Sequence, residues 1–235
     1  MAIPITKDFE LPSRGRLYGK DIKWKNQLRS PRLCDRGFGD IIQKNKLQAS
    51  ILDKTIVEPL GMSTYDLHPA DFIYLNFIQR QLLKGAAPYK ISVICKSCGK
   101  KHDLDIDVTD IKILPLKESG LSPMVVKVDD ETEVTVTYAT PRILDDIKAG
   151  VELFKEEYPN ADGDIETQEY LRKVITHVNG ARLTYTQATT FIQNLFLSAV
   201  EEIINASTTY EWGVQLLRKH RCDACGKMIA FNLPV

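Results

Sequence analysis

The sequence lacks three features that would assign it to a common class. No apolar run approaches the length of about 18 residues that a membrane span needs. The N-terminal residues MAIPITKDFELPS have neither the basic start nor the apolar stretch of a signal peptide, so we expect none. The 31 Lys and Arg residues balance 31 Asp and Glu residues. This balance argues against a dedicated nucleic-acid binder, which usually shows a basic excess or stripe.

Signatures of common enzyme sites are also missing. There is no P-loop, no Gly-rich dinucleotide turn, no Gly-x-Ser-x-Gly elbow and no His-Glu-x-x-His. One acidic cluster, DLDIDVTD at residues 103–110, could suggest a metal or acid–base site. Its first three carboxylates alternate with apolar residues, however, which is typical of the solvated face of a half-buried strand. We therefore expect no enzymatic turnover.

Cysteine is scarce but organised. Four of the five cysteines form two Cys-x-x-Cys pairs, CKSCGK at 95–100 and CDACGK at 222–227, and Cys34 is left as a plain thiol. Paired cysteines without a secretory context favour a metal in a reducing cytoplasm over disulfides. A Cys-x-x-Cys-Gly turn supplies two thiolates, and two such turns complete the tetrahedral set that zinc prefers. The sequence thus predicts one structural zinc, bound by Cys95, Cys98, Cys222 and Cys225.

Other interpretations of the cysteine pairs stay open. A redox dithiol is usually at the start of a helix, whereas each pair here follows a predicted strand. A zinc deaminase needs a His-x-Glu or Cys-x-Glu motif that the chain does not contain. The cysteines could carry no metal, and His102 or His220 could replace a thiolate, although we expect both at the surface. Lysines and arginines crowd the two turns, where they can offset the negative charge of a four-thiolate zinc.

Hydrophobic periodicity predicts an α+β chain that is mainly helical. Helices are expected at 38–56, 69–84, 140–158, 166–178 and 186–205. Strands are expected at 89–95, 104–108, 124–128, 134–138, 214–217 and 228–233, with each cysteine pair between two strands. A helix, a glycine, a strand and a Cys-x-x-Cys-Gly turn follow one another at 69–99 and again at 187–226. The repetition predicts two equivalent hairpins that face one another across the zinc.

Residues 1–36 are predicted to be an extended arm, because they contain Pro4, Pro12 and Pro31 and show no sustained period. Apolar residues occur at intervals along this otherwise polar arm. Two interpretations follow: a strap on the protein's own core, or an arm that docks on a neighbouring subunit. The docking interpretation assigns partner binding to Phe9, Leu11, Pro12, Ser13, Arg14, Gly15 and Tyr18.

The order of these motifs resembles the baseplate hub and hub-assembly proteins of T-even-like contractile-tailed bacteriophages. The residues that carry the resemblance are Leu11 to Gly15, Tyr18, the helix start around Asp71, Tyr89 and the four paired cysteines. It extends over most of the chain and thins between about 110 and 185. The resemblance implies a virion structural or assembly protein, made in the cytoplasm of the infected bacterium, that helps to build the baseplate hub through contacts with other hub proteins.

The resulting prediction has two parts along the chain. Residues 1–36 form the arm, and residues 37–235 form a helical domain with a split zinc ribbon whose knuckles are at 95–98 and 222–225. The segment 110–185 is a candidate subdomain. The function predicted is that of a baseplate hub component or hub-assembly factor. The alternative is a zinc-ribbon protein that binds nucleic acid through the basic residues around the knuckles.

Overall fold

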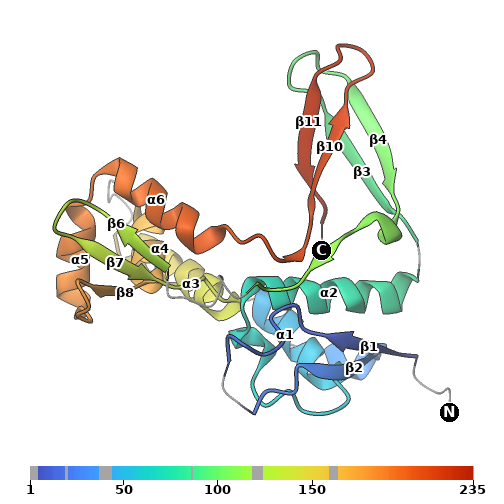
Figure 1. Ribbon diagram of the computed structural model, residues 1–235, viewed down its shortest axis with the longest axis horizontal. Helices are drawn as coiled ribbons and strands as arrows, with labels where there is room; N and C mark the ends of the chain where they lie inside the picture. The colour runs from blue at the N-terminus through green and yellow to red at the C-terminus, as the bar shows by residue number, and fades with distance from the viewer. Residues whose placement is uncertain are drawn as a thin grey trace.

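The computed structural model describes residues 5–18, 21–36, 44–85, 87–117, 124–158 and 164–234. Three parts are visible in Figure 1: a helical body (residues 5–85), a distal lobe (residues 124–136 and 165–208) and a hairpin pair (residues 89–106 and 217–232) that projects from the body. Six α-helices and several small sheets make up this described part, which confirms the α+β class. None of the described helices combines the length and apolarity needed to cross a membrane.

The helical body is built on α2 (Pro69–Lys84), whose bounds match the sequence prediction. The His68 side chain accepts a hydrogen bond from the backbone N–H of Ala70, Pro69 occupies the first turn, and Gly85 ends the helix with a positive φ of 59°. Helix α1 (Lys44–Thr55) packs beside it. The predicted helical residues Phe38, Ile41 and Ile42 lie outside the described residues. Three short 3-10 helices are also present: η1 (Leu33–Arg36), η2 (Thr64–Asp66) and η3 (Val108–Asp110).

The N-terminal residues form a strand pair, where the sequence predicted an arm without a period. Strand β1 (Thr6–Glu10) pairs antiparallel with β2 (Lys25–Arg29). Each of the two strands buries a single side chain, Phe9 in β1 and Leu28 in β2, so neither shows the alternation that marks a half-buried strand. Both side chains enter the core of the helical body. Tertiary contacts determine which strand β1 pairs with and which of its side chains is buried, and a local sequence pattern cannot reveal such contacts.

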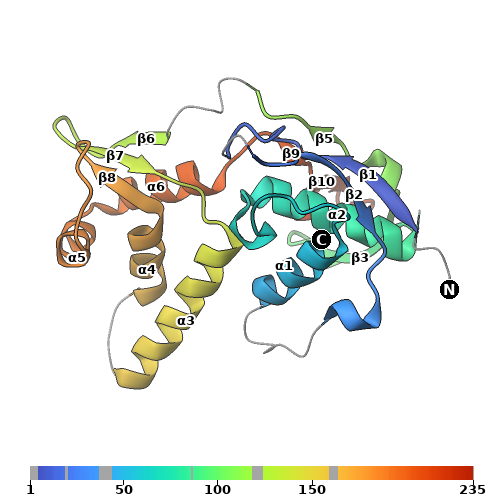
Figure 2. The same ribbon diagram turned by 90° about the horizontal axis from the view of Figure 1, so that it is seen from below.

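The distal lobe has its own core. Strands β6 (Met124–Lys127), β7 (Glu133–Val136) and β8 (Ile175–Val178) form an antiparallel sheet in that order. Helices α4 (Ile165–Val174), α5 (Tyr185–Gln193) and α6 (Leu197–Thr208) lie on one side of it (Figure 2). The fully or nearly fully buried side chains of this core are Val134, Leu171, Val174 and Ile203.

Two predicted helices of this lobe are wrong in part. The helix expected at 166–178 ends at Val174, and the β-branched run that follows joins the sheet as β8. The helix expected at 186–205 is broken into α5 and α6, because the backbone N–H groups of Asn194 and Leu195 bond three residues back instead of four. Phe196, expected on an apolar helix face, is 74% exposed at the break.

Helix α3 (Pro141–Glu157) runs between the distal lobe and the helical body (Figure 2). It begins as predicted, with the Thr140 side chain accepting a hydrogen bond from the N–H of Ile143. Its buried Asp145 joins it to the body, since this carboxylate accepts hydrogen bonds from the Asn45 side chain at 2.8 Å and the Tyr65 hydroxyl at 3.0 Å. The two parts are thus held together by a satisfied buried carboxylate.

A cluster of four aromatic rings also packs where the distal lobe meets the helical body. The His68 ring lies 4.1 Å from Tyr138, 4.5 Å from Trp212 and 5.2 Å from Tyr210, measured between ring centroids. Tyr138 lies between β7 and α3, and Tyr210 and Trp212 lie between α6 and β9 (Gly213–Val214). Burial lowers the pKa of His68 to about 3, so this histidine is neutral at physiological pH.

The hairpin pair stands on the body through a short two-stranded sheet. Strands β3 (Tyr89–Ile94) and β4 (Lys101–Ile106) form one hairpin, and β10 (Leu217–Arg221) and β11 (Met228–Asn232) form the other. At their base, β5 (Ile113–Leu114) pairs with β9 (Gly213–Val214). Gly213 has a φ of +84°, and an added Cβ would lie 2.8 Å from the Cβ of Ala70. Glycine there lets the strand approach the first turn of α2 closely.

Candidate metal centre

Each cysteine pair lies at the tip of a hairpin, and the two tips lie side by side (Figure 1). The two turns have the same backbone hydrogen bonds. The N–H of Cys95 donates to the carbonyl of Lys100 at 2.9 Å, and the N–H of Cys222 donates to that of Lys227 at 2.8 Å. Gly99 and Gly226 have φ angles of 74° and 72°, the left-handed conformation that such a turn needs. Two distant segments thus present equivalent knuckles, as the repeated motif predicted.

The four sulfur atoms form one compact cluster. The Sγ atoms of Cys95, Cys98, Cys222 and Cys225 all lie within 4.8 Å of one another. Across the two hairpins, Cys95 Sγ lies 3.7 Å from Cys225 Sγ, and Cys98 Sγ lies 3.6 Å from Cys222 Sγ. Four thiolates placed tetrahedrally about 2.3 Å from a zinc ion are separated by about 3.8 Å. The cluster therefore fits a metal of that size and geometry.

The same sulfur–sulfur distances show that the cysteines are not joined in disulfides. A disulfide bond joins two sulfurs at about 2.05 Å, and all four cysteines are free here. The four cysteines differ in exposure: Cys95 and Cys222 are buried, whereas Cys98 and Cys225 are exposed. Each knuckle thus contributes one buried sulfur and one sulfur at the surface. A complete four-thiolate sphere has no open position for a water or substrate, in contrast to catalytic zinc sites.

Backbone amides in the first knuckle favour the thiolate form. The N–H groups of Cys98 and then Ser97 point at the Cys95 sulfur and lower the pKa of that thiol to about 7. A thiolate is the form that binds metal. Neither pair is at a helix N-terminus, because each follows a strand and precedes Gly-Lys. The helix-start arrangement of redox dithiols is therefore not found in this part of the described chain.

Charged side chains surround the cluster. Lys100 Nζ lies 2.8 Å from Asp223 Oδ2, a contact between the two hairpins. Most of the neighbouring lysines and arginines are exposed, as expected for charges that offset four thiolates. His102 is a correction to the prediction of a surface residue, since it is buried at 8% exposure between the hairpins. Its Nδ1 lies 3.7 Å from Asp223 Oδ1, and its ring lies 4.9 Å from that of His220.

His102, Cys222 and Asp223 also form a group whose ligand atoms lie within 4.8 Å of one another. No sequence signal singled out Asp223, because it is the x residue after the first cysteine of its knuckle. His102 was considered only as a substitute ligand. The structure instead places both beside the four thiols, His102 buried and Asp223 exposed.

The residues assigned to the arm lie mostly inside the helical body. Phe9, Leu11 and Ser13 are 3%, 1% and 0% exposed. Pro12 is also buried, whereas Arg14 is exposed and Gly15 is half-buried. This burial matches the interpretation as a strap on the protein's own core, and it leaves little of the set free for a partner.

Asp71 explains why the strap and the start of α2 belong together. Its buried carboxylate accepts hydrogen bonds from the backbone N–H of Ser13 at 3.1 Å and from the Tyr18 hydroxyl at 2.7 Å. The Tyr18 oxygen in turn accepts from the N–H of His68 at 2.9 Å. Burial raises the pKa of Asp71, although the hydrogen bonds from Ser13 and Tyr18 oppose that shift. We call this set of contacts the Asp71 lock.

Comparison with known proteins gives one match. Residues 43–234 match the protein family described as T4 bacteriophage base plate protein. The match begins after residue 42, so the Leu-Pro-Ser-Arg-Gly segment lies outside it, whereas all four paired cysteines lie within it. No curated protein and no solved structure matched the chain. Because the matched range covers most of the 235 residues, this chain belongs to the T4 bacteriophage base plate protein family.

Proposed function

We propose that this baseplate protein is a component of the baseplate hub, or a factor that assembles the hub, and that it acts through contacts with other baseplate proteins. The observation that carries the proposal is the family match over residues 43–234 together with the order of motifs that resembles hub proteins. Assembly takes place in the cytoplasm of the infected bacterium. The family match supports a location in the baseplate of the virion tail.

The role of the metal in this proposal is structural. Cys95, Cys98, Cys222 and Cys225 would hold one zinc ion, which would supply four metal–sulfur bonds between segments more than a hundred residues apart. The sulfur spacing supports this assignment. The knuckles themselves position the thiols, through their paired backbone hydrogen bonds and left-handed glycines. The zinc thereby fixes the hairpin pair as one rigid projection of the body.

The protein has no catalytic role in this proposal. The four thiols form a compact group of reactive side chains among the described residues, and a closed four-thiolate cluster offers no place for a substrate. The function would then be carried by surfaces, which suits a protein of zero net charge with several exposed apolar side chains. Leu197 (82%), Phe196 (74%) and Leu153 (66%) are examples in the distal lobe and α3.

A phage that lacks this gene tests the proposal. Heads should still assemble, whereas tails should fail at baseplate formation, and the intact gene supplied from a plasmid should restore them. A plasmid that encodes Lys127→Glu, a change on the exposed side of β6, is a matched control that should also restore tails. Normal baseplates in the mutant phage would overturn the proposal.

The alternative of nucleic-acid binding rests on exposed basic residues around the knuckles, such as Lys96 and Lys227. Two neighbours of this group, Lys100 and Lys101, are paired with Asp223 and Asp103, which reduces the free positive charge. A heparin column separates the two functions. A hub protein should elute at low salt, whereas a nucleic-acid binder should be retained and show a steep dependence on salt.

A further inference from the structure

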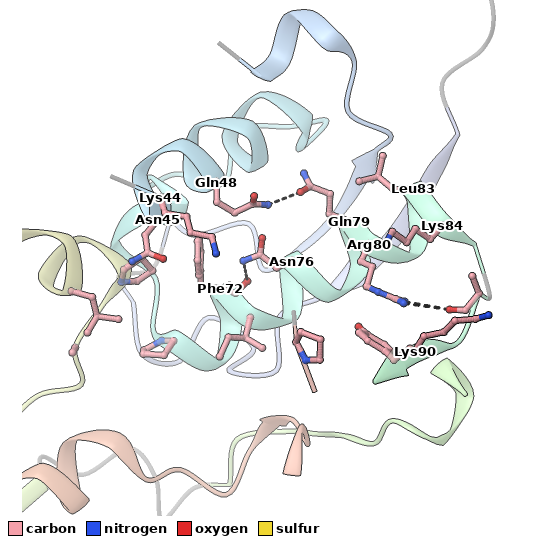
Figure 3. A pocket seen from close by; sticks show the side chains of 18 of the residues that line it. Lys44, Asn45, Gln48, Phe72, Asn76, Gln79, Arg80, Leu83, Lys84 and Lys90 are labelled. Carbon is pink, nitrogen blue, oxygen red and sulfur yellow. Dashed lines mark hydrogen bonds between the residues drawn. The ribbon is translucent and has the colours of Figure 1, made fainter. Parts of the chain in front are cut away.

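We propose that a groove between α1, α2 and α3 binds an acidic, extended segment of a partner protein. The groove has a volume of about 1050 Å³ and is bounded by these helices, by the start of β3 and by Pro234 near the C-terminus. Its volume is just above the range of about 300–1,000 Å³ that is typical of small-molecule pockets, which favours a chain segment over a small ligand. Figure 3 shows the side chains that line it.

The charge of the groove has one sign. Five cations line it, and none of the lining residues that the structure describes is a carboxylic acid. Such a segregation is informative, because the whole chain has equal numbers of acidic and basic residues. None of the five forms an ion pair with a described carboxylate, in contrast to Lys100 and Lys101 at the knuckles. The five cations are Lys44, Arg80, Lys84, Lys90 and Lys148.

The cations are distributed along the groove. Lys44 lies toward one end of the labelled side chains in Figure 3, and Arg80, Lys84 and Lys90 lie toward the other, with uncharged amides between them. A single phosphate or carboxylate could contact only one end. An extended segment with acidic residues at both ends would contact the two groups together, and each residue of such a segment spans about 3.3 Å.

Arg80 is held in place before any ligand arrives. Its guanidinium lies 3.4 Å from the centroid of the Tyr89 ring. The carbonyls of Ala87 and Pro88 accept long hydrogen bonds of 3.4 Å from the same group. These weak contacts leave the guanidinium able to form stronger bonds, and the stacking fixes its plane. A fixed guanidinium plane favours bidentate binding of a carboxylate.

Apolar side chains make the groove more than an electrostatic surface. Leu83 is 59% exposed and Leu144 is 37% exposed, and both face this groove together with several prolines. The occupant must therefore carry apolar side chains as well as acidic ones. A nucleic acid would need exposed aromatic faces for base stacking. Of the lining aromatics, Phe72 is only 7% exposed and Arg80 covers the Tyr89 ring, so a protein segment fits better.

Amide side chains in the middle of the groove supply the second observation. Gln79 is 5% exposed, and its Oε1 accepts a hydrogen bond from Gln48 at 2.6 Å. Its Nε2 has no partner among the described residues, and neither has Oδ1 of Asn76, one helical turn earlier. One is a donor and the other an acceptor. A peptide backbone carries one donor and one acceptor per residue, and rotation of these amides toward the groove would let it pair with both.

The inference deepens the proposed function, because it specifies how a baseplate partner would be recognised. Its test uses purified full-length protein and fluorescence anisotropy. The probe is a labelled peptide in which glutamates and leucines alternate within a glycine–serine background. Two matched peptides replace either the glutamates by lysines or the leucines by serines. We expect binding of the acidic, apolar peptide only, weakened by salt as expected for a charged groove.

Two pairs of variants locate the binding site. Lys84→Glu should weaken peptide binding by about tenfold or more, whereas Lys127→Glu, the same charge change on β6, should leave it unchanged. Leu83→Ser should weaken it severalfold, whereas Leu153→Ser, a similarly exposed leucine on α3 outside the groove, should not. Circular dichroism of each variant reports whether the fold is retained.

Three results would overturn the proposal: no binding of the acidic peptide, equal loss in both members of a pair, or a labelled single-stranded oligonucleotide that binds more tightly and is lost in Lys84→Glu. Because these measurements need no phage, they are independent of the gene-deletion experiment. A groove that fails here leaves the hub assignment standing, and a deletion phage with normal baseplates leaves peptide binding standing.

Discussion

The N-terminal strap and the C-terminal hairpin each attach to a distant part of the chain, but different forces hold them. The strap is fixed by buried side chains, with Phe9 and Leu11 in the core of the helical body and the Asp71 lock beneath them. In the C-terminal hairpin, by contrast, strands β10 and β11 have no fully buried side chain, since every residue in both is exposed or half-buried. Its attachment rests on the thiol cluster at the tip, on β5–β9 at the base and on Leu233, which follows β11 and lies in the core of the helical body.

This difference separates two kinds of stability in one chain. The strap depends on apolar burial and on a hydrogen-bonded carboxylate. Neither needs a metal ion or a reduced thiol. With the proposed zinc bound, the hairpin pair would depend on a metal and on reduced thiols, so chelators and oxidants would act on it without unfolding the body. If the two attachments are independent, each should respond to its own perturbation and leave the other intact.

Deleting residues 1–18 should have the largest effect and abolish cooperative folding of the helical body. The deletion removes Phe9 and Leu11 from the core, and it leaves the buried carboxylate of Asp71 without its hydrogen-bond donors. Leu11→Ala alone should lower the free energy of unfolding by about 2–5 kcal/mol. Ile5→Ala, at a residue that is 68% exposed, is the matched control and should change it little. Urea denaturation measures both, and a truncated chain that stays folded would restore the interpretation of the arm as a docking segment.

Cysteine substitutions should release the hairpin pair while the body stays folded. Protein purified without chelator should contain about one zinc per chain by elemental analysis, and Cys222→Ser should lose it as completely as Cys95→Ser. Hydrogen exchange should then quicken in both hairpins and stay slow in α2. Cys34→Ser, at an exposed cysteine outside the cluster, is the control that should keep the metal. Zinc-free protein with protected hairpins would show that the thiols alone hold them.

The sequence was sufficient for the thiol site because its information is local. Each knuckle is a short turn with its own glycine, and the strands beside it alternate, so the pattern predicted both hairpins and the four cysteines that cluster between them. Helix α2 was equally predictable, because Pro69 marks its start and Gly85 marks its end. Where a single chemical motif determines the geometry, a sequence reveals it.

The parts that the sequence concealed depend on long-range contacts. Nothing near Asp71 indicates that it is fully buried, since its two donors come from Ser13 and Tyr18 more than fifty residues away. The break between α5 and α6 is similarly hidden, because the apolar period continues through Asn194. The strand β8 did have a local signal in its β-branched run, which was outweighed by the helical pattern before it. The groove is assembled from several separate segments, and no pattern along the chain could reveal it.

Asp71→Ala should destabilise the body by about 2–4 kcal/mol, because the Ser13 N–H and the Tyr18 hydroxyl both lose their acceptor in a buried place. Tyr18→Phe removes only one of these bonds and should cost less. The hairpin pair should keep its zinc in both variants. Denaturant titration measures the loss, and a larger effect of Tyr18→Phe than of Asp71→Ala would contradict the lock as described.

Acid should act on the two attachments in opposite directions. Burial raises the folded pKa of Asp71, so the folded state binds a proton more tightly than the unfolded state. Its contribution is therefore greatest below the unfolded pKa of about 3.9 and is lost as pH rises through the raised folded value. Metal-bound thiolates respond the other way, since protons compete with the metal. From neutral pH downward, exchange in the hairpin tips should quicken before exchange in β1 and β2, and Asp71→Asn should remove the contribution of Asp71 to the pH dependence of the strap.

The smallest effect is expected from the ion pair that bridges the two hairpins. Lys100 and Asp223 are 47% and 65% exposed, and ion pairs this open to solvent contribute little, because water and salt screen them. Lys100→Ala should leave the zinc content and the exchange rates of both tips unchanged, and added salt should not mimic the cysteine variants. The matched control is Lys101→Ala, whose partner Asp103 lies on the same hairpin. Should Lys100→Ala loosen the tips as much as Cys98→Ser does, charge and not metal would be what joins the middle of the chain to its tail.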